Sequence, residues 1–580
     1  MSFFILRKAD LSIRTADELA DYFHHAGIKR VSTEQLKGYE LTIFSDLAGN
    51  APERYVGNNG DFIVQFGSLI YRKMVGHKAL QSALESFDQE TFDWADMLGS
   101  YTLLIYKSGD FYVVNDGLGT AKLYFDDAEH VISNSFLACC LSTPISHLNT
   151  AACYEYVING ALFGTDTLVE GVNSYPANTI IRASAGTIHS IVKPSPIQQS
   201  DEVAALSLDE AATLHCQQLR NVFEPIANGY ADRLRVSFSG GFDSRLMLAM
   251  LLEQDIKPAL FVYGSDHDAD VLIARHVAKA EGLELVHVNK AVTPIPNLDE
   301  FEAISRRNLI AFDGWKVEYG LLDHGEDVTD RLSRHDQNAV PLNGSLGEIY
   351  RNFHYIPDGR SSTGAVTSTF YSQYDTQAFS AQFSEKDYRQ RFSNNMLAAL
   401  HSEHERLERY QVEELYPLFR GRFWTGRDTQ LNQRFGTMFF PYMEPKAIDN
   451  TAKVAIKHKD LGYLQGKMIA QTNPRLASYP SDYGFPFDGP RPLAYRAKTW
   501  LGTQRPAWLR KQSFKLTNRN PFDKNGVFSE AYLQQVIDPT FPRVGSLFEL
   551  ASVYSQKQFG LIATLEFLAT ELDLSVKLKL

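Results

Sequence analysis

The sequence predicts a mixed fold: an α+β part of stacked antiparallel sheets, followed by an α/β part built on a doubly wound parallel sheet with helical additions. Residues 1–200 contain short runs of β-branched and aromatic residues, separated by closely spaced Gly, Asp and Asn turns. This pattern is typical of packed antiparallel sheets. Beyond residue 203, strand-like and helix-like segments alternate, which indicates parallel strands joined by crossover helices.

The first part is predicted from its strand segments and from the polar stretch that ends it. The segment 178–192 predicts a hairpin around Ala185-Gly186, and the polar residues 193–202, with two prolines and no periodicity, predict a linker. We therefore expect domains at 1–195 and 203–580. The other predicted strand segments are 62–71, 101–107, 110–116 and 130–135.

The second part begins with helical periodicity over 207–228, followed by a strand at 234–239. A Gly-Gly turn and a helix come next. From about residue 300 the chain is expected to be mainly helical with long loops, and the polar segment 356–376 predicts either a mobile lid or a plain insertion. The remaining predicted elements are a strand at 259–264, a helix at 269–281 and a strand at 283–289.

The composition excludes several classes of protein. The chain has 580 residues, of which 44% are hydrophobic and 22% charged, so it can bury more than one core and is not expected to be disordered. A formal net charge of −12 disfavours a globally basic nucleic-acid binder. We see no signal peptide and no membrane-spanning run, and expect a soluble cytoplasmic protein. The cysteines form neither a zinc motif nor a disulfide framework, and they are Cys139, Cys140, Cys153 and Cys216.

The hexapeptide SGGFDS, between a predicted strand and a predicted helix, is the most informative motif. Gly240 and Gly241 let the backbone approach a ligand closely, and the free N–H groups at the helix start attract an anion. Ser239 and Ser244 add hydroxyl donors. Asp243 would repel a phosphate unless it held a metal ion, so the loop implies Mg²⁺. The alternative is a tight, capped turn that binds nothing.

Several segments together resemble the class II asparagine synthetases and their relatives, the β-lactam synthetases and lasso-peptide cyclases. SGGFDS is similar to the signature loop of the ATP-pyrophosphatase (PP-loop) superfamily, and differs from a Walker A loop and a Rossmann fingerprint. Residues 261–289 resemble the family's second strand, helix and third strand. The segment 341–355 resembles its second pyrophosphate loop, 462–474 its lysine-bearing segment, and 99–125 a stretch of its glutaminase domain. The likeness covers most of 40–480.

This resemblance implies a fold and a set of site residues. The first domain would be of the N-terminal nucleophile (Ntn) hydrolase type, with αββα layers, and the second of the adenine nucleotide α-hydrolase type. Lys467 and Glu348 would be catalytic, Asp243 and Glu348 would hold Mg²⁺, and Lys467 would stabilise charge on the α-phosphate and the tetrahedral intermediate. A solvated helix lysine is the alternative for Lys467. The implied ATP site contains Ser237, Ser239, Gly240, Gly241, Asp243, Ser244, Val262, Gly264, Asn343 and Gly344.

Two departures from the family pattern affect what can be carried over. Family members that hydrolyse glutamine have a nucleophilic cysteine directly after the initiator methionine, and this chain has Ser2. The resemblance therefore implies an N-terminal domain without glutaminase activity. In the second loop, Ser345 stands where asparagine synthetases have Glu and the β-lactam branch has Tyr, while Glu348 aligns with a metal-binding Asp.

Other polar residues have competing interpretations. Asp268 and Asp270 precede a helix and are expected to cap it, and His287, near the end of a strand, is expected to be structural. The acid-free segment 491–519 is either a solvated face or an electropositive wall for an anionic substrate or carrier; single-stranded nucleic acid is poorly supported. It contains Trp500, Trp508 and the basic residues Arg491, Arg496, Lys498, Arg505, Arg510, Lys511, Lys515 and Arg519.

Together these features predict an ATP-dependent amide ligase that forms AMP and diphosphate, in specialised metabolism such as antibiotic biosynthesis. The substrates would be a carboxylate and an amine, each a small molecule or part of a peptide, with a homodimer as an option and neither membrane nor nucleic acid as a partner. An intramolecular cyclase, an ammonia-dependent asparagine synthetase-like enzyme and an inactive scaffold are the alternatives. A sulfur-transferring PP-loop enzyme acting on tRNA is disfavoured, because neither a cysteine pair nor a globally basic composition is present.

Overall fold

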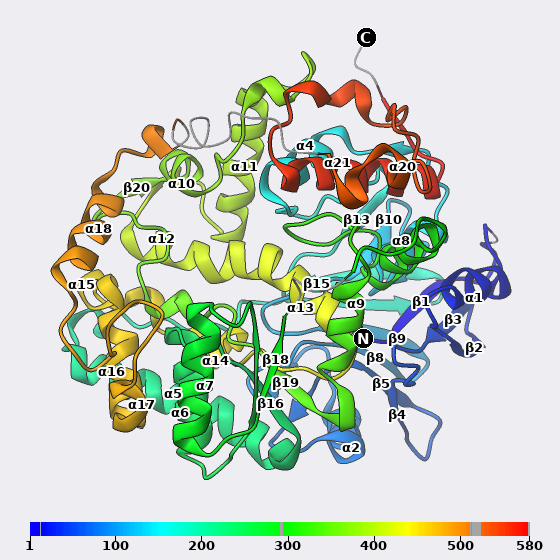
Figure 1. Ribbon diagram of the computed structural model, residues 1–580. Coiled ribbons are helices and arrows are strands. Elements are labelled where there is room, and N and C mark those ends of the chain that lie inside the picture. The colour runs from blue at the N-terminus through cyan, green and yellow to red at the C-terminus, as the bar shows by residue number, and fades with distance from the viewer. Residues whose placement is uncertain (12, 290–293, 511, 513–523, 578–580) are drawn as a thin grey trace.

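The computed structural model describes residues 1–580 except for 12, 290–293, 511, 513–523 and 578–580. In Figure 1 the blue strands of the first part lie at the right of the molecule, and the orange helices of the second part lie at the left. Within the described residues, no helix combines the length and the apolar composition needed to cross a membrane.

Two six-stranded sheets form the first part, and their strands are antiparallel. The first sheet has the order β13-β10-β11-β1-β3-β2 and the second has the order β15-β14-β9-β8-β5-β4. The first contains β1 (Phe3–Lys8), β2 (Arg30–Leu36), β3 (Tyr39–Phe44), β10 (Tyr124–Asp126), β11 (Val131–Ser133) and β13 (Val172–Ser174). The second contains β4 (Glu53–Val56), β5 (Phe62–Gly67), β8 (Tyr101–Lys107), β9 (Asp110–Asn115), β14 (Thr179–Ser184) and β15 (Thr187–Val192).

The alternation of apolar residues along β1 explains how these sheets stack. Phe4 and Leu6 point between the sheets and pack with Phe62 and other residues of the second sheet, while Phe3 and Ile5 face outward against helices. The outer face of the first sheet is covered by α1 (Ala16–His24), α3 (Phe136–Leu141) and α4 (Thr150–Asn159), and that of the second by α2 (Gly76–Ser86). The prediction of stacked antiparallel sheets is confirmed.

The hairpin that ends the first part is also confirmed. β14 and β15 pair around Ala185 and Gly186, whose φ angles of 48° and 80° are both positive. Two consecutive positive φ values give a tight hairpin turn that matches the twist of the strands. Of residues 193–202, predicted to be a linker, 193–200 contain no helix or strand, and a 3-10 helix (Asp201–Ala205) begins at the end of the segment.

The second part contains a parallel four-stranded sheet with the order β18-β17-β16-β19. Its elements agree with the predicted ones within a few residues. Leu260 and Val262 of β17 pack into the core that α6 and α7 share, whereas Phe261 and Tyr263 lie under the guanidinium of Arg334, just after α9. Both faces of the sheet are therefore covered. The elements are α5 (Leu208–Tyr230), β16 (Leu234–Ser237), α6 (Phe242–Leu252), β17 (Ala259–Tyr263), α7 (Ala269–Glu281), β18 (Leu285–Val288), α9 (Glu326–Ser333) and β19 (Val340–Leu342).

The strand order places a topological switch point at β16. From β16 the chain proceeds to β17 and β18 on one side, and later returns to pair β19 on the other side. In open parallel sheets, ligands bind outside the carboxyl ends of the strands where the order reverses. The loops that leave β16 and β19 therefore flank the expected ligand crevice.

The rest of the second part is mainly helical, as predicted. In the segment 356–376, for which the sequence predicted either a mobile lid or a plain insertion, α10 (Thr363–Phe370) forms and buries Val366 against the core. The other helices are α8 (Phe301–Ala311), α11 (Glu385–Ala399), α12 (Arg409–Leu415), the π-helical segment Tyr416–Thr425, α13 (Gly426–Gln433), α14 (Pro445–Ile448), α15 (Ile456–Lys459), α16 (Tyr463–Thr472), α17 (Pro474–Ser478), α18 (Leu493–Gln504), α20 (Glu530–Leu533) and α21 (Gln556–Glu571). Short two-residue strands are β6 (Ile70–Tyr71), β7 (Met97–Leu98), β20 (Ser361–Ser362) and β21 (Arg406–Leu407).

The C-terminal helix joins the two parts of the chain. Helix α21 packs on α4, and β22 (Ser575–Val576) pairs in parallel with β12 (His147–Leu148). Figure 1 shows the red C-terminal helix against the cyan α4. The last described residues therefore lie on the first part, although they follow the second part in sequence.

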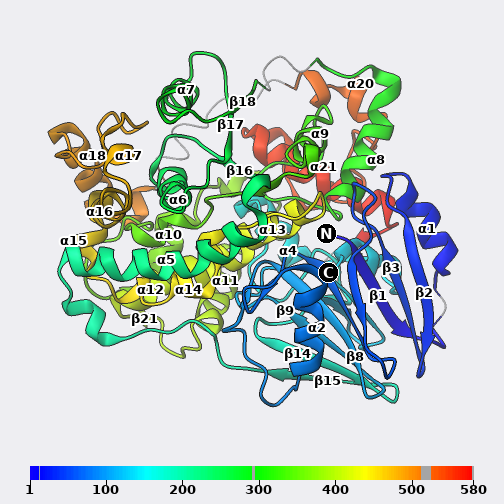
Figure 2. The ribbon, with the colours of Figure 1, turned by 90° about the horizontal axis from the view of Figure 1, so that it is seen from below.

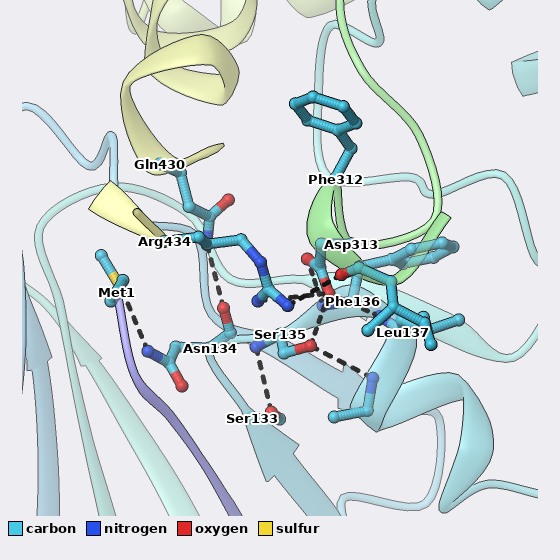
Figure 3. A network of polar contacts seen from close by, with 12 residues as sticks. Met1, Ser133, Asn134, Ser135, Phe136, Leu137, Phe312, Asp313, Gln430 and Arg434 are labelled. Carbon is cyan, nitrogen blue, oxygen red and sulfur yellow. Dashed lines mark hydrogen bonds and ion pairs between the residues drawn. The ribbon is translucent and has the colours of Figure 1, made fainter. Parts of the chain in front are cut away.

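A buried carboxylate also links the two parts (Figure 3). Asp313 accepts hydrogen bonds from the Ser135 hydroxyl and from the backbone N–H groups of Phe136 and Leu137, at 2.9 Å and 3.1 Å for the two backbone donors. It thus satisfies the first turn of α3, which has no internal acceptors for these groups. A residue of the second part completes a helix of the first.

Candidate functional site

The loop after β16 forms the first part of the candidate site. Gly240 has a φ of +78°, and a Cβ atom there would lie 2.5 Å from Cγ2 of Ile273, so only glycine fits. Gly241 is the N-cap of α6 and offers no side chain to cap it. No side chain of the N-cap residue therefore accepts from the N–H groups in the first turn of α6. Free N–H groups at the start of a helix suit an anion.

The two serines of the loop face each other. The backbone N–H of Ser239 donates to Oγ of Ser244 at 3.3 Å, and the two hydroxyl oxygens are 3.4 Å apart. Ser239 is exposed and Ser244 is buried. The hydroxyl groups thus gather at the end of the strand, just beyond Ser237, the last residue of β16.

The loop after β19 packs directly on Asp243. A Cβ atom on Gly344 would lie 3.4 Å from Cβ of Asp243, and a Cβ atom on Gly347 would lie 2.3 Å from its Oδ1 atom. Asn343 shapes this loop, since its Oδ1 accepts from the N–H and the hydroxyl of Ser345 at 2.8 Å and 2.6 Å. The structure therefore brings the two predicted phosphate loops together at the switch point.

Asp243 and Glu348, one from each loop, share a cation. Nη2 of Arg351 lies 2.7 Å from Oδ2 of Asp243 and 3.4 Å from Oε1 of Glu348. The other oxygen of Asp243 accepts from Nε2 of Gln465 at 2.7 Å, and the other oxygen of Glu348 accepts from the hydroxyl of Tyr416 at 2.7 Å. All four carboxylate oxygens thus have donors.

The pKa of Asp243 is raised to about 7, chiefly by burial. Burial raises this pKa, the neighbouring carboxylate of Glu348 raises it further, and the guanidinium of Arg351 opposes both. A third carboxylate, Asp482, lies 3.7 Å from the position that a Cβ on Gly241 would take. Burial, followed by repulsion from Asp270, raises the pKa of Asp482 to about 6. The loop is therefore edged by several carboxylates and one guanidinium.

The donor set agrees in kind with Mg²⁺. This ion binds oxygen ligands, and usually takes one or two carboxylates together with phosphate oxygens and water. Asp243 and Glu348 could supply the carboxylates, with phosphate and water to complete the shell. In the described part of the chain, no group of three or more His, Cys, Asp or Glu side chains has the arrangement of a metal site. Arg351 would have to release Asp243 before both carboxylates could bind the same ion.

Lys467, the predicted catalytic lysine, is not brought to this loop. Its Nζ lies 2.5 Å from Oδ1 of Asp209 in the first turn of α5, and its side chain is 38% exposed. Residues two apart on a helix point about 200° from each other. Because Gln465 of α16 reaches Asp243, Lys467 faces away from it. The cation in contact with Asp243 is the guanidinium of Arg351.

The residues around Gly264 show a similar mixture of agreement and correction. Val262 is buried in β17, and Gly264 has a φ of +140° directly after this strand. Asp268 occupies the N-cap position of α7, but its carboxylate accepts from the N–H and hydroxyl of Ser265 instead of capping the helix. Asp270 lies in the first turn and is not the N-cap. His287 bonds the carbonyl of Gly264 at 2.7 Å, as a structural histidine would.

The sequence did not reveal which residues support the loop after β16. Arg245, fully buried in α6, donates to the carbonyls of Leu476 and Pro480 at 2.9 Å and 2.7 Å, and so fixes the segment that carries Asp482. Tyr483 accepts from Nη1 of Arg351 at 2.8 Å. Of these residues, Arg351 could have been identified from the sequence, because it lies inside the segment 341–355 that resembles a pyrophosphate loop.

The Ser2 region contains a cavity of about 560 Å³ between the two parts of the chain. Ser2 is 5% exposed, and Met1, Asp46, Gln65 and Gln433 also line the cavity. No cysteine lines it. All four cysteines are buried, and burial raises the pKa of each thiol, so none has the character of a reactive thiolate.

Comparison with known proteins gives little further guidance. No protein-family model and no curated protein matches the chain. Among solved structures, the chain is similar to the "allosteric regulatory enzyme of purine biosynthesis", with 8% identity, a TM-score of 0.23, and coverage of 51% of this chain and 82% of that one. It is also similar to glutamine phosphoribosylpyrophosphate amidotransferase from B. subtilis, with 10% identity, a TM-score of 0.20, and coverage of 50% and 65%. Similarities this weak carry no conclusion about function.

Proposed function

We propose that the chain is an ATP-dependent amide ligase that activates a carboxylate as an acyl-adenylate and transfers it to an amine. One observation carries the proposal: the loops after β16 and β19 meet at the switch point of the parallel sheet, with Asp243, Glu348 and Arg351 in contact. A glycine-rich turn at a helix N-terminus suits phosphate, and opposed carboxylates suit a phosphate-bound cation.

The proposed reaction has two steps. A substrate carboxylate oxygen attacks the α-phosphorus of ATP, and the bond to the β-phosphate oxygen breaks, which yields acyl-adenylate and diphosphate. The amine then attacks the acyl carbon, AMP leaves, and the amine loses a proton. Mg²⁺ held by Asp243 and Glu348 would neutralise phosphate charge when bound.

The residues of the chain have distinct roles in this proposal. The uncapped N–H groups at the start of α6 and the hydroxyls of Ser239 and Ser244 bind phosphate oxygens. Arg351, in releasing Asp243, turns its guanidinium to the phosphates and stabilises the charge that develops during adenylation. Gln465 orients the carboxylate of Asp243, which it contacts at 2.7 Å. Lys467 has no assigned role, because it pairs with Asp209.

The source of the amine separates the alternatives. Position 2 is a serine and no cysteine lines the neighbouring cavity. The amine would therefore come from a second substrate, from free ammonia or from the activated substrate itself. The last source makes the enzyme a cyclase that forms a β-lactam or a macrolactam. A specialised-metabolite role is favoured over primary asparagine synthesis, because Ser345 replaces the residue that asparagine synthetases have in the second loop.

The test is isotope exchange between diphosphate and ATP, with a panel of carboxylic acids, amino acids and short peptides, together with the effect of MgATP on thermal unfolding. We expect ATP to raise the unfolding temperature, because it binds only the folded chain. We expect at least one acid to support exchange. Both signals should be lost in Asp243→Asn and kept in Asp209→Asn, the matched change at the exposed partner of Lys467. A folded wild-type protein that neither responds to ATP nor exchanges diphosphate would be a scaffold, and would contradict the proposal.

A further inference from the structure

Helix α18 is attached to the molecule by one face only. None of its twelve residues is buried. Tyr495, Thr499 and Gly502, spaced as one helical face, are half-buried and form the attached side. Figures 1 and 2, seen from directions 90° apart, both place α18 at the edge of the molecule opposite α1. The remaining surface of the helix faces solvent.

The outward face of α18 is apolar. Leu493, Ala497, Trp500 and Leu501 follow the i, i+4, i+7, i+8 spacing of one helical stripe and are all exposed. Leu493 is 78% exposed, Trp500 62% and Leu501 61%. Shortly after the helix, Trp508 is 67% exposed. We call these five residues the α18 face.

Such a concentration is unusual within this molecule. Five of the fourteen large apolar side chains that are exposed in the described residues lie between Leu493 and Leu509. The other three tryptophans of the chain are buried or half-buried. Contiguous exposed apolar surface marks a site of interaction with a protein or a membrane.

The charges beside the α18 face are all positive. Arg496 and Lys498 flank the apolar stripe on its two sides, and Arg505 follows the last residue of the helix. No acidic residue occurs between 489 and 510, although the whole chain has a net charge of −12. The partner of this surface is therefore expected to be anionic.

We propose that the α18 face binds the surface of an anionic lipid bilayer. A helix with tryptophan and leucine on one side and flanking Lys and Arg is the combination that lies in the plane of a membrane interface. The helix of twelve residues, about 18 Å long at 1.5 Å per residue, would lie along this plane and not cross it. A projecting ridge suits a deformable lipid phase better than the surface of a folded acidic protein, which would have to supply a matching groove.

The experiment is co-sedimentation with vesicles of phosphatidylcholine alone and of phosphatidylcholine mixed with phosphatidylglycerol, at low and high salt. We expect binding to the mixed vesicles that weakens with salt. The double variants Trp500→Ser/Trp508→Ser and Arg496→Glu/Lys498→Glu should each reduce partitioning by roughly tenfold or more. Leu272→Ser and Lys279→Glu, at exposed positions of α7, are the matched controls and should bind as the wild type does.

A second readout locates the contact. Vesicles that contain brominated phosphatidylcholine quench tryptophan fluorescence only where the indole enters the bilayer. We expect quenching in the wild type and its loss in the Trp500→Phe/Trp508→Phe variant, since Trp94 and Trp315 are buried in the core and Trp424 is half-buried. The proposal is overturned if the wild type does not bind mixed vesicles, or if binding is indifferent to Trp500 and Trp508. It is equally overturned if these tryptophans instead drive concentration-dependent self-association, or capture an acidic protein without affecting lipid binding.

Discussion

Nη2 of Arg351 lies 2.7 Å from Oδ2 of Asp243, so the guanidinium occupies the space next to the carboxylate that the proposal assigns to a phosphate-bound cation. The Arg351 side chain is 18% exposed and also contacts Glu348 and Tyr483. A half-buried cation between two carboxylates compensates their desolvation while no other cation is present. Under the proposed function, binding of MgATP would free the same guanidinium to contact phosphate.

The first prediction separates Arg351 from Lys467 as the cation of the transition state. Arg351→Met should lower kcat for diphosphate exchange by roughly 10²–10³, as loss of an oxyanion donor does. Lys467→Met should change kcat little, because Lys467 pairs with Asp209 on the far side of α16. Arg351→Lys should recover only part of the activity, since a single ammonium cannot span two groups as a planar fork does.

The measurement is steady-state kinetics of exchange, with circular dichroism and thermal unfolding to show that each variant is folded. If Lys467→Met lost activity while Arg351→Met kept it, the resemblance-based assignment of Lys467 would be right, and the position of α16 would differ in the working enzyme.

A second prediction concerns the contact between the two loops. Gly347→Ala would put a Cβ atom 2.3 Å from Oδ1 of Asp243, which forces the carboxylate or the loop to move. We expect loss of exchange with a modest change in stability. Gly364→Ala is the control, because the nearest atom to its Cβ would be Oγ of Ser362 at 3.8 Å. Full activity in Gly347→Ala would show that the loop after β19 does not need this fit.

The sequence predicted the fold and the two loops better than the side chains that complete the site. The strand-turn-helix around Gly240 and Gly241, and the segment around Glu348, are local patterns, and each could be recognised without knowing its surroundings. The motif around Lys467 did not show that this lysine would pair with Asp209, because a motif does not specify the rotation of its helix: Gln465, two residues earlier, faces Asp243. Gln465, Asp482 and Arg351 each reach the loop around Gly241 and Asp243 from a segment more than a hundred residues away in sequence, which no local pattern contains.

Similar reasons explain two features of the fold that the sequence did not predict. The segment 356–376 has no clear polar–apolar period, yet α10 forms in it because tertiary contacts bury Val366 against the core. The position of α21 on α4 depends on the packing of two apolar helices that lie some 400 residues apart in sequence. Neither helix contains a sequence pattern that identifies the helix on which it packs.

A third prediction concerns the network that joins the two parts of the chain (Figure 3). Asp313 is 1% exposed, caps α3 and lies 3.2 Å from Nη1 of Arg427, which is equally buried. Asp313→Ala leaves this guanidinium without its carboxylate and α3 without its acceptor, and should lower the free energy of unfolding by about 3–5 kcal/mol. Urea unfolding is the measurement. Asp17→Ala, which breaks the exposed pair with Arg30, should have little effect. Equal effects of the two variants would contradict the structural role given to Asp313.

The fourth prediction is that His354 contributes to the fall in the free energy of unfolding at acidic pH. His354 is 1% exposed and packs against Phe353, Phe370 and Tyr416, and burial lowers its pKa to about 3. The unfolded chain binds a proton at this histidine near pH 6.5, whereas the folded chain does not until the pH is much lower. Between these values the unfolded state holds more protons, so the free energy of unfolding rises with pH in this window and is level above it. One proton corresponds to about 1.4 kcal/mol per pH unit.

His354→Phe should therefore flatten the dependence of the urea midpoint on pH between about 4 and 6.5, because phenylalanine keeps the aromatic packing and removes the titration. His404→Phe, at an exposed position, serves as the control and should leave the slope as it is in the wild type. An unchanged slope in His354→Phe, with the fold intact, would mean that His354 binds its proton equally in both states and is not held neutral by burial.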